Sequence, residues 1–337
     1  VYIGGQIPNE WWWIGGDGNE DPKFGYYDVE SQIWDQIAYN APTYLVVKSA
    51  GNDRIDIGPN PGEAYTIVDD NGTPLNTSTQ PRPADCAPAG YDCLPLHSVA
   101  KNILTVGAID DLPGGYAPLA GPGQVSMAPF SGWGPTDDGR IKPDLVANGV
   151  LLLSTWIDEY SPYAVASGTS MASPSVTGSL LLLQEHYADL HDTGSFMRSA
   201  TLKAIAIQTA DEAGSADGPD YEFGWGLLNT RKAAELISDA HVGVDHQVIE
   251  GSLVNGTTDS ILVHVSSGNS VIRATIVWMD PPGTPASASL DPTEPMLVND
   301  LDLRVIDGLT VYEPWVLDPA VPAAAATQGD NSRDNVE

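Results

Sequence analysis

One stretch of the sequence determines how the rest is interpreted: Gly168-Thr169-Ser170-Met171-Ala172-Ser173-Pro174. It precedes an apolar segment, residues 175–187, that has helical character. Small residues around Ser170 would let a substrate backbone approach its hydroxyl, and the dipole and free N–H groups of a helix start favour negative charge nearby. The same pattern suits an ordinary helix start, with a Ser or Thr cap and a proline in the first turn. The residues by themselves leave both readings open.

Helix and strand signals alternate through the first two-thirds of the chain. Helices are predicted over residues 31–40, 175–187, 196–210 and 229–237, and apolar strands over residues 44–47, 103–107 and 150–153. Continuously apolar strands interleaved with helices predict an α/β fold, with a parallel sheet that has helices on both faces.

The pattern changes near residue 241, where short β-branched segments separated by turn residues take over. Strands are predicted over residues 247–254, 261–265, 271–278, 301–306 and 309–312. The sequence therefore predicts two domains, residues 1–240 and residues 241–337, of which the second is a smaller antiparallel β-sandwich or jelly roll.

The seven residues from Gly168 to Pro174 resemble the serine signature of the subtilase family at every position. The resemblance implies a subtilisin-like catalytic domain over about residues 24–240, with Ser170 as the nucleophile that forms an acyl-enzyme. Residues 46–53 resemble the strand that ends in the oxyanion-hole asparagine of that family, whereas Gly51-Asn52 taken alone is only a turn signal. By the resemblance, Asn52 and the Ser170 backbone N–H stabilise the tetrahedral oxyanion.

The same resemblance extends beyond the catalytic part. Residues 276–283 and 298–303 look like the β-barrel domain appended to some bacterial subtilases. The aspartate and histidine motifs of the family precede the strand that ends in Asn52, and we expect both to lie before Val1. None of the six histidines stands in such a motif.

A serine without its base is not activated, so we expect this polypeptide to be almost inactive alone and its parent to be a serine endopeptidase. A catalytically dead, subtilase-like binding protein is the alternative. A third reading, an unrelated α/β-hydrolase, lacks support because no Gly-x-Ser-x-Gly motif surrounds Ser170.

The composition limits the kinds of partner and the cellular compartment that we expect for this protein. With 14 basic and 45 acidic residues, the net charge of −31 disfavours nucleic acid and anionic lipid. No apolar run is long enough to cross a membrane. Cys86 and Cys93 lie seven residues apart in a loop-like stretch, which favours a disulfide over two free thiols and so a secreted, extracellular protein. We expect a monomer that acts on protein or peptide substrates.

Calcium is the expected cofactor, in a structural role. Asn299, Asp300 and Asp302 offer oxygen ligands at the start of a predicted strand, and Asp330, Asn331 and Asp334 could add to them: all six are of the type that calcium requires. The alternative is turn chemistry, in which Asn and Asp side chains bond to their own backbone.

Overall fold

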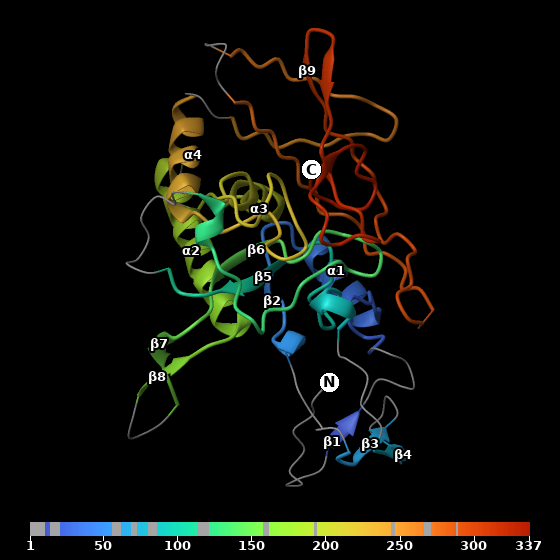
Figure 1. Ribbon diagram of the computed structural model, residues 1–337. Helices are drawn as coiled ribbons and strands as arrows, with labels where there is room; N and C mark the ends of the chain where they lie inside the picture. Colours follow the sequence, from blue (N-terminus) through green and yellow to red (C-terminus); the bar gives the residue numbers. More distant parts are fainter. Residues whose placement is uncertain are drawn as a thin grey trace.

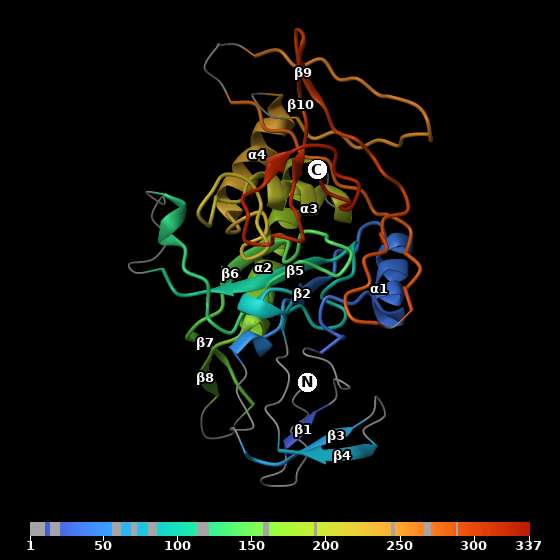
Figure 2. The ribbon, with the colours of Figure 1, turned by 45° about the vertical axis from the view of Figure 1, so that its right-hand side comes forward.

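A three-stranded parallel sheet lies at the centre of the molecule (Figures 1 and 2). Its strands are β2 (Val47–Ser49), β5 (Leu104–Ile109) and β6 (Leu145–Asn148), in the order β2-β5-β6. All six residues of β5 are buried, as expected for the middle strand of a covered parallel sheet. The computed structural model describes residues 11–13, 21–55, 62–68, 73–79, 86–112, 121–157, 162–191, 194–243, 247–265, 271–287 and 289–337.

Helix α2 (Thr169–Leu190) packs against all three strands, and α4 (Thr230–Val242) packs against α2 and against α3 (Ser199–Gln208). One apolar core joins the sheet to all three helices, and its buried members include Val106, Leu145, Val176, Leu180, Ile205 and Leu236. The helix predictions for these regions are confirmed, although α2 begins six residues earlier than its apolar periodicity indicates and includes Ser170.

Helix α1 (Val29–Asn40) lies apart from these three helices, beside the C-terminal part of the chain, in both views (Figures 1 and 2). Its first turn is capped by Asp28, whose carboxylate accepts a hydrogen bond from Ser31 N at 2.7 Å. Gln32 Nε2 donates to Gly283 O at 2.7 Å, so the helix is joined to a segment 251 residues further along the chain.

The prediction for residues 150–153 is wrong in its placement. These residues overlap β7 (Leu152–Thr155), which pairs antiparallel with β8 (Tyr163–Ala166) and does not join the parallel sheet. Leu153 is 70% exposed, so its apolar character does not reflect burial in the core. The third strand of the sheet is β6, which the sequence analysis missed because charged residues precede it.

Those charged residues are buried and paired. Asp144, directly before β6, accepts hydrogen bonds from Lys142 Nζ at 2.5 Å and from Thr105 N at 2.6 Å, and it forms an ion pair with Lys203 Nζ at 2.8 Å. Burial alone would raise the pKa of Asp144, but Lys142 and Lys203 hold it below its ordinary value. The ion pairs therefore fix β5, β6 and α3 relative to one another.

A second, smaller sheet contains β1 (Trp11–Trp13), β3 (Tyr65–Val68) and β4 (Pro74–Ser78) in the order β1-β3-β4. The predicted disulfide between Cys86 and Cys93 is confirmed, and both cysteines are buried beside Phe24. In the described part of the chain, none of the helices combines the length and apolar character needed to cross a bilayer.

The C-terminal region contains short antiparallel pairs. They are β9 (Val305–Asp307) with β10 (Thr310–Tyr312), and β11 (Trp315–Val316) with β12 (Thr327–Gln328). The strand predictions for residues 247–254 and 261–265 are wrong, because those residues belong to no strand. They run extended in Figure 1, and their apolar side chains are exposed instead of facing a second sheet. Within the described residues after 241, the predicted sandwich or jelly roll is represented by these two small antiparallel sheets.

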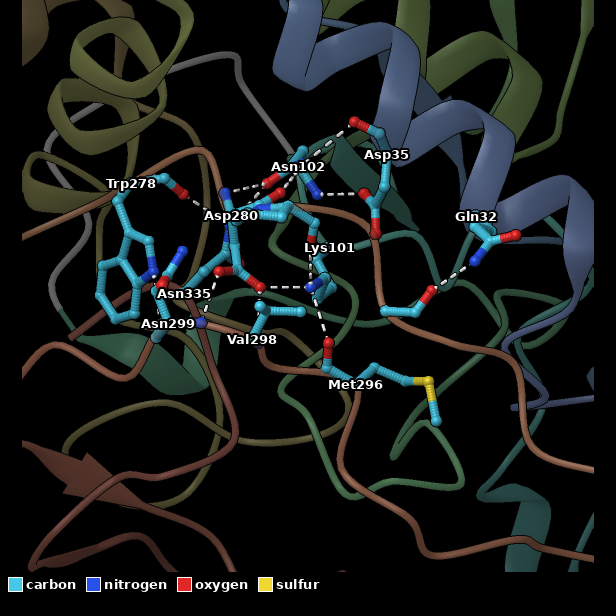
Figure 3. A network of polar contacts seen from close by, with 12 residues as sticks. Gln32, Asp35, Lys101, Asn102, Trp278, Asp280, Met296, Val298, Asn299 and Asn335 are labelled. Atoms are coloured by element: carbon cyan, nitrogen blue, oxygen red, sulfur yellow. Dashed lines mark hydrogen bonds and ion pairs between the residues drawn. The ribbon is translucent and has the colours of Figure 1, made fainter.

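A buried polar network joins the C-terminal region to the residues before β5 and to α1 (Figure 3). Lys101 forms an ion pair with Asp280 in which both side chains are completely buried, and its ammonium also donates to Met296 O at 2.7 Å. Asn102 Nδ2 donates to Asp280 O at 2.7 Å, and Asn102 N donates to the Asp35 carboxylate at 2.8 Å. The segment around Asp280 is thus bonded to residues that directly precede β5 and to α1.

Replacement of Asp280 by Asn leaves the Lys101 ammonium buried without a counter-charge. We expect Asp280→Asn to lower the free energy of unfolding by about 3 kcal/mol. Urea titration followed by tryptophan fluorescence measures the change. The matched control is Asp302→Asn, which removes a carboxylate from an exposed pair with Arg304 and should change the free energy by less than about 1 kcal/mol. Equal effects of the two substitutions would contradict a stabilising role for the buried pair.

Candidate functional site

Ser170 is the second residue of α2 and is exposed to solvent. Gly168 precedes the helix with φ +152°, and Met171 N donates to Gly168 O at 2.9 Å. Pro174 is the sixth residue of the helix, so it lacks the N–H that would otherwise donate to Ser170 O four residues earlier. The Ser170 hydroxyl therefore lies at the positive end of a 22-residue helix, next to backbone N–H groups that have no partner inside the helix.

Asn52 follows β2 in a tight turn at the carboxyl end of the parallel sheet. Gly51 has φ +98°, and a Cβ on it would lie 2.5 Å from Pro95 Cδ, so only glycine fits there. The turn leaves the Asn52 side chain exposed, while Ala50 and Gly51 are buried. Carboxyl ends of parallel strands are the usual location of binding sites in open α/β sheets.

Thr169 joins the two predicted site residues. Asn52 Oδ1 accepts hydrogen bonds from Thr169 N and from Thr169 Oγ1, both at 2.9 Å. A backbone N–H can only donate, so the oxygen of the Asn52 amide must face Thr169 and the Nδ2 group must face away from it. The structure therefore brings Asn52 against Thr169, the residue directly before the exposed Ser170, with the Asn52 Nδ2 group turned away from Thr169.

The sequence analysis did not identify Thr169 as a positioning residue. Its side chain is fully buried, and its hydroxyl is also 3.2 Å from Gly51 N and 3.2 Å from Gly51 O. The only signal in the sequence is the place of Thr169 directly before Ser170 in the motif. The sequence does not show which turn faces Thr169, so the contacts of its hydroxyl with the Asn52 turn could not be predicted.

Positive charge lies close to the Asn52 turn. Arg54 Nε donates to Ser131 O at 3.0 Å, and the guanidinium stacks on the Trp133 ring, 3.8 Å from its centroid. Burial lowers the pKa of Arg54, while Glu222 and Tyr91 raise it. Lys48 of β2 is half-buried, and burial lowers its pKa as well. Both groups favour negative charge that develops near the turn.

The described histidines have partners away from Ser170. His97 contacts Glu30, His186 Nε2 lies 2.8 Å from Ser238 Oγ, and the His191 ring stacks on Tyr187 and meets the His241 ring edge-on. His264 is exposed, and His246 lies outside the described residues. Within the described part of the chain, therefore, the structure pairs no histidine with the serine.

Two of the three predicted calcium ligands, Asn299 and Asp302, have hydrogen bonds within the chain. Asn299 N donates to Asp280 Oδ1 at 2.8 Å, and Asp302 Oδ1 accepts from Arg304 Nη2 at 3.1 Å. Arg304 Nη2 also donates to Asp330 Oδ1 at 2.7 Å, so a positive charge already lies beside the predicted calcium ligands. Burial raises the pKa of Asp300, and Asp302 and Asp330 raise it further. Calcium at Asn299, Asp300 and Asp302 stays a prediction.

Three other carboxylates of the described residues lie close enough together to hold a metal ion: Asp92, Asp137 and Asp291. The sequence analysis missed this group. Its members are separated by 45 and 154 positions in the chain (137 − 92 and 291 − 137) and form no spacing pattern. Only the fold brings them together.

Comparisons with known proteins identify relatives of this chain. The model of the subtilase family matches residues 16–226, which is more than half of the chain. The chain is 26% identical over 362 residues to the Serine protease/ABC transporter B family protein tagA of Dictyostelium discoideum, covering 85% of this chain and 20% of that protein. It is 30% identical over 194 residues to the C5a peptidase of Streptococcus pyogenes serotype M3, covering 54% of this chain and 16% of that protein.

Two solved structures are also similar. The Clostridium perfringens CspB protease is 27% identical, with a TM-score of 0.36, and the match covers 50% of this chain and 31% of that chain. The self-cleaved protease domain of PatA is 21% identical, with a TM-score of 0.41, and the match covers 64% of this chain and 57% of that chain. This chain spans about a fifth or less of the length of the two curated relatives.

The Thr169 hydroxyl provides a test of how the site is held. Thr169→Val keeps the volume but leaves buried polar groups of the Asn52 turn without that partner, so we expect the free energy of unfolding to fall by about 1–3 kcal/mol. The control on the same helix is Thr177→Val, because Thr177 Oγ1 is exposed and only donates to Ser173 O; there we expect a change of less than about 0.5 kcal/mol. Urea midpoints compare the two variants, and an unchanged midpoint for Thr169→Val would refute the assigned role.

Proposed function

This chain belongs to the subtilase family, and on that premise we propose that it is part of a serine endopeptidase whose nucleophile is Ser170. One observation carries the proposal: Asn52 Oδ1 accepts from Thr169 N, which turns the Asn52 Nδ2 donor away from Thr169, beside the exposed Ser170. A donor amide next to an accessible hydroxyl at a helix start is the arrangement that acyl transfer requires.

In the proposed reaction, Ser170 Oγ forms a bond to the carbonyl carbon of a peptide and loses its proton to a base. The carbonyl oxygen then carries a negative charge, which Asn52 Nδ2 and Ser170 N–H stabilise by hydrogen bonds. Loss of one such donor typically costs ~3 kcal/mol of transition-state stabilisation. The helix dipole of α2 favours the same charge. Expulsion of the amine leaves the acyl group on Ser170, and water then releases it.

The base is the part of this mechanism that the described residues do not provide. The histidines in the described ranges bond to groups other than Ser170. We therefore propose that residues 1–337 alone are inactive and that the aspartate and histidine are contributed by other parts of the protein. The same observation supports the alternative proposal, a catalytically dead subtilase-like protein that binds peptides without cleaving them.

The substrate class and compartment follow as further proposals. The relatives include a C5a peptidase, and peptide-bond cleavage is the chemistry of the site, so we propose protein or peptide substrates for this chain. The buried disulfide between Cys86 and Cys93 favours an oxidising, extracellular compartment. The charge of −31 disfavours nucleic acid as a partner. We propose a monomer with structural calcium.

Labelling with a serine-directed fluorophosphonate tests the function. We expect residues 1–337 to remain unlabelled, because the Ser170 hydroxyl has no base. In the product of the same gene, extended upstream to its start, we expect labelling at Ser170, no labelling of Ser170→Ala, and peptide hydrolysis lowered about 10²–10³-fold by Asn52→Ala. Mass spectrometry locates the label.

Two outcomes would overturn parts of this account. Rapid labelling of residues 1–337 that Ser170→Ala abolishes would show that another group of this chain acts as the base. An extended protein that neither labels nor cleaves peptides, but still binds them, would establish the catalytically dead alternative.

A further inference from the structure

Three carboxylates from distant parts of the chain meet at one place. Asp92 directly precedes the disulfide residue Cys93, Asp137 lies in the loop before β6, and Asp291 belongs to the C-terminal region. One oxygen of each lies within 4.8 Å of the others. Three negative charges at this separation repel one another, so either a bound cation or the uptake of a proton reduces the charge there.

Asp137 is the decisive member of the group. It is only 9% exposed, and neither of its carboxylate oxygens has a hydrogen-bond partner within the described structure. Its pKa is raised to about 9, first by burial and then by the charges of Asp92, Asp291 and Asp138. Native proteins rarely leave a buried carboxylate without partners, and the usual explanation is a missing water or ion.

The nearby arginine does not supply the missing charge. Arg140 directs its Nε to Asp138 at 2.8 Å and its Nη1 to Val99 O at 2.6 Å. Among the ion pairs of the described residues, none includes Asp137. The Arg140 Nε is therefore committed to Asp138, and the two carboxylate oxygens of Asp137 have no hydrogen-bond partner among the described residues.

The backbone around the group is held in place independently of any ligand. Asp137 N donates to Gly25 O at 3.1 Å, Gly25 N donates to Leu94 O at 2.9 Å, and Asp92 N donates to Gly134 O at 2.9 Å. Gly25 has φ +71°, and a Cβ on it would lie 2.1 Å from an oxygen of Asp137 and 2.1 Å from an oxygen of Asp92. Only glycine leaves space for the two carboxylates there.

From this geometry we infer that Asp92, Asp137 and Asp291 bind a calcium ion. All three ligands are hard oxygens, with no sulfur or nitrogen that would favour zinc or copper. Calcium binds oxygens at about 2.4 Å, so ligands on opposite sides of the ion are about 4.8 Å apart, and the observed convergence fits that sphere. Water and backbone carbonyls complete the coordination, as they do in other calcium sites.

The ion would join the C-terminal region to the surroundings of Asn52. Cys93 N, next to Asp92, donates to Trp133 O at 2.8 Å, and Gly132 N donates to Gly51 O at 3.0 Å. A cation on Asp92 and Asp137 is therefore two hydrogen-bonded steps from the turn that positions the Asn52 amide. This site is separate from Asn299, Asp300 and Asp302, and its occupancy does not depend on whether the chain is a peptidase.

Calcium titration of the purified chain tests the inference. We expect isothermal titration to show binding, and the unfolding temperature to be higher in calcium than in EDTA. Asp137→Asn should weaken the affinity by about tenfold or more, because it removes the buried ligand charge. The matched control is Glu235→Gln, which alters an exposed carboxylate paired with Arg231 and should bind calcium as the unchanged chain does. Terbium luminescence excited through the neighbouring Tyr91 and Trp133 gives a second readout.

The EDTA measurement separates a ligand role from a purely structural one. Without calcium, Asp137→Asn removes charge repulsion, so this variant should unfold at a higher temperature than the unchanged chain. In calcium, the variant should unfold at a lower temperature than the unchanged chain. If Asp137→Asn fails to fold, Asp291→Asn replaces it, because Asp291 is exposed. Equal unfolding temperatures of the unchanged chain in calcium and EDTA would overturn the inference. Loss of binding in Asp302→Asn alone would assign calcium to the Asn299 stretch instead.

Discussion

Two hydrogen bonds from Thr169 to Asn52 Oδ1 are the constraint on which the candidate site depends. They connect the end of a sheet strand to the first residue of α2, which are 117 positions apart in the chain. Because they occupy the amide oxygen of Asn52, they orient its nitrogen as a donor. The apolar core between α2 and the sheet then keeps the strand end and the helix start in register.

Buried ion pairs add to this apolar packing elsewhere in the molecule. Asp144 with its two lysines joins the sheet to α3, and the Lys101–Asp280 pair joins the sheet to the C-terminal region (Figure 3). Buried ion pairs are specific rather than strongly stabilising, since a wrong partner would leave a charge uncompensated.

Features that depend on neighbouring residues could be predicted from the sequence, whereas features that depend on contacts between distant residues could not. Helices α2, α3 and α4 follow from periodicity, and Ser170 and Asn52 follow from short motifs. Strand β6 was not predicted because its neighbour Asp144 is charged, and the sequence does not show that Lys203, 59 positions away (203 − 144), pairs with Asp144 in the core. The strand predictions for residues 247–254 and 261–265 failed because alternation predicts an amphipathic strand but not the partner strand that it needs.

A high-resolution crystal structure of this chain tests the central claim most directly, through the side chains of residues 52 and 170. The account predicts that the amide oxygen of Asn52 lies within hydrogen-bond distance of Thr169 N, with its nitrogen and the Ser170 hydroxyl both open to solvent on the same side. An Asn52 amide bonded elsewhere, or a Ser170 hydroxyl enclosed by other side chains, would contradict it.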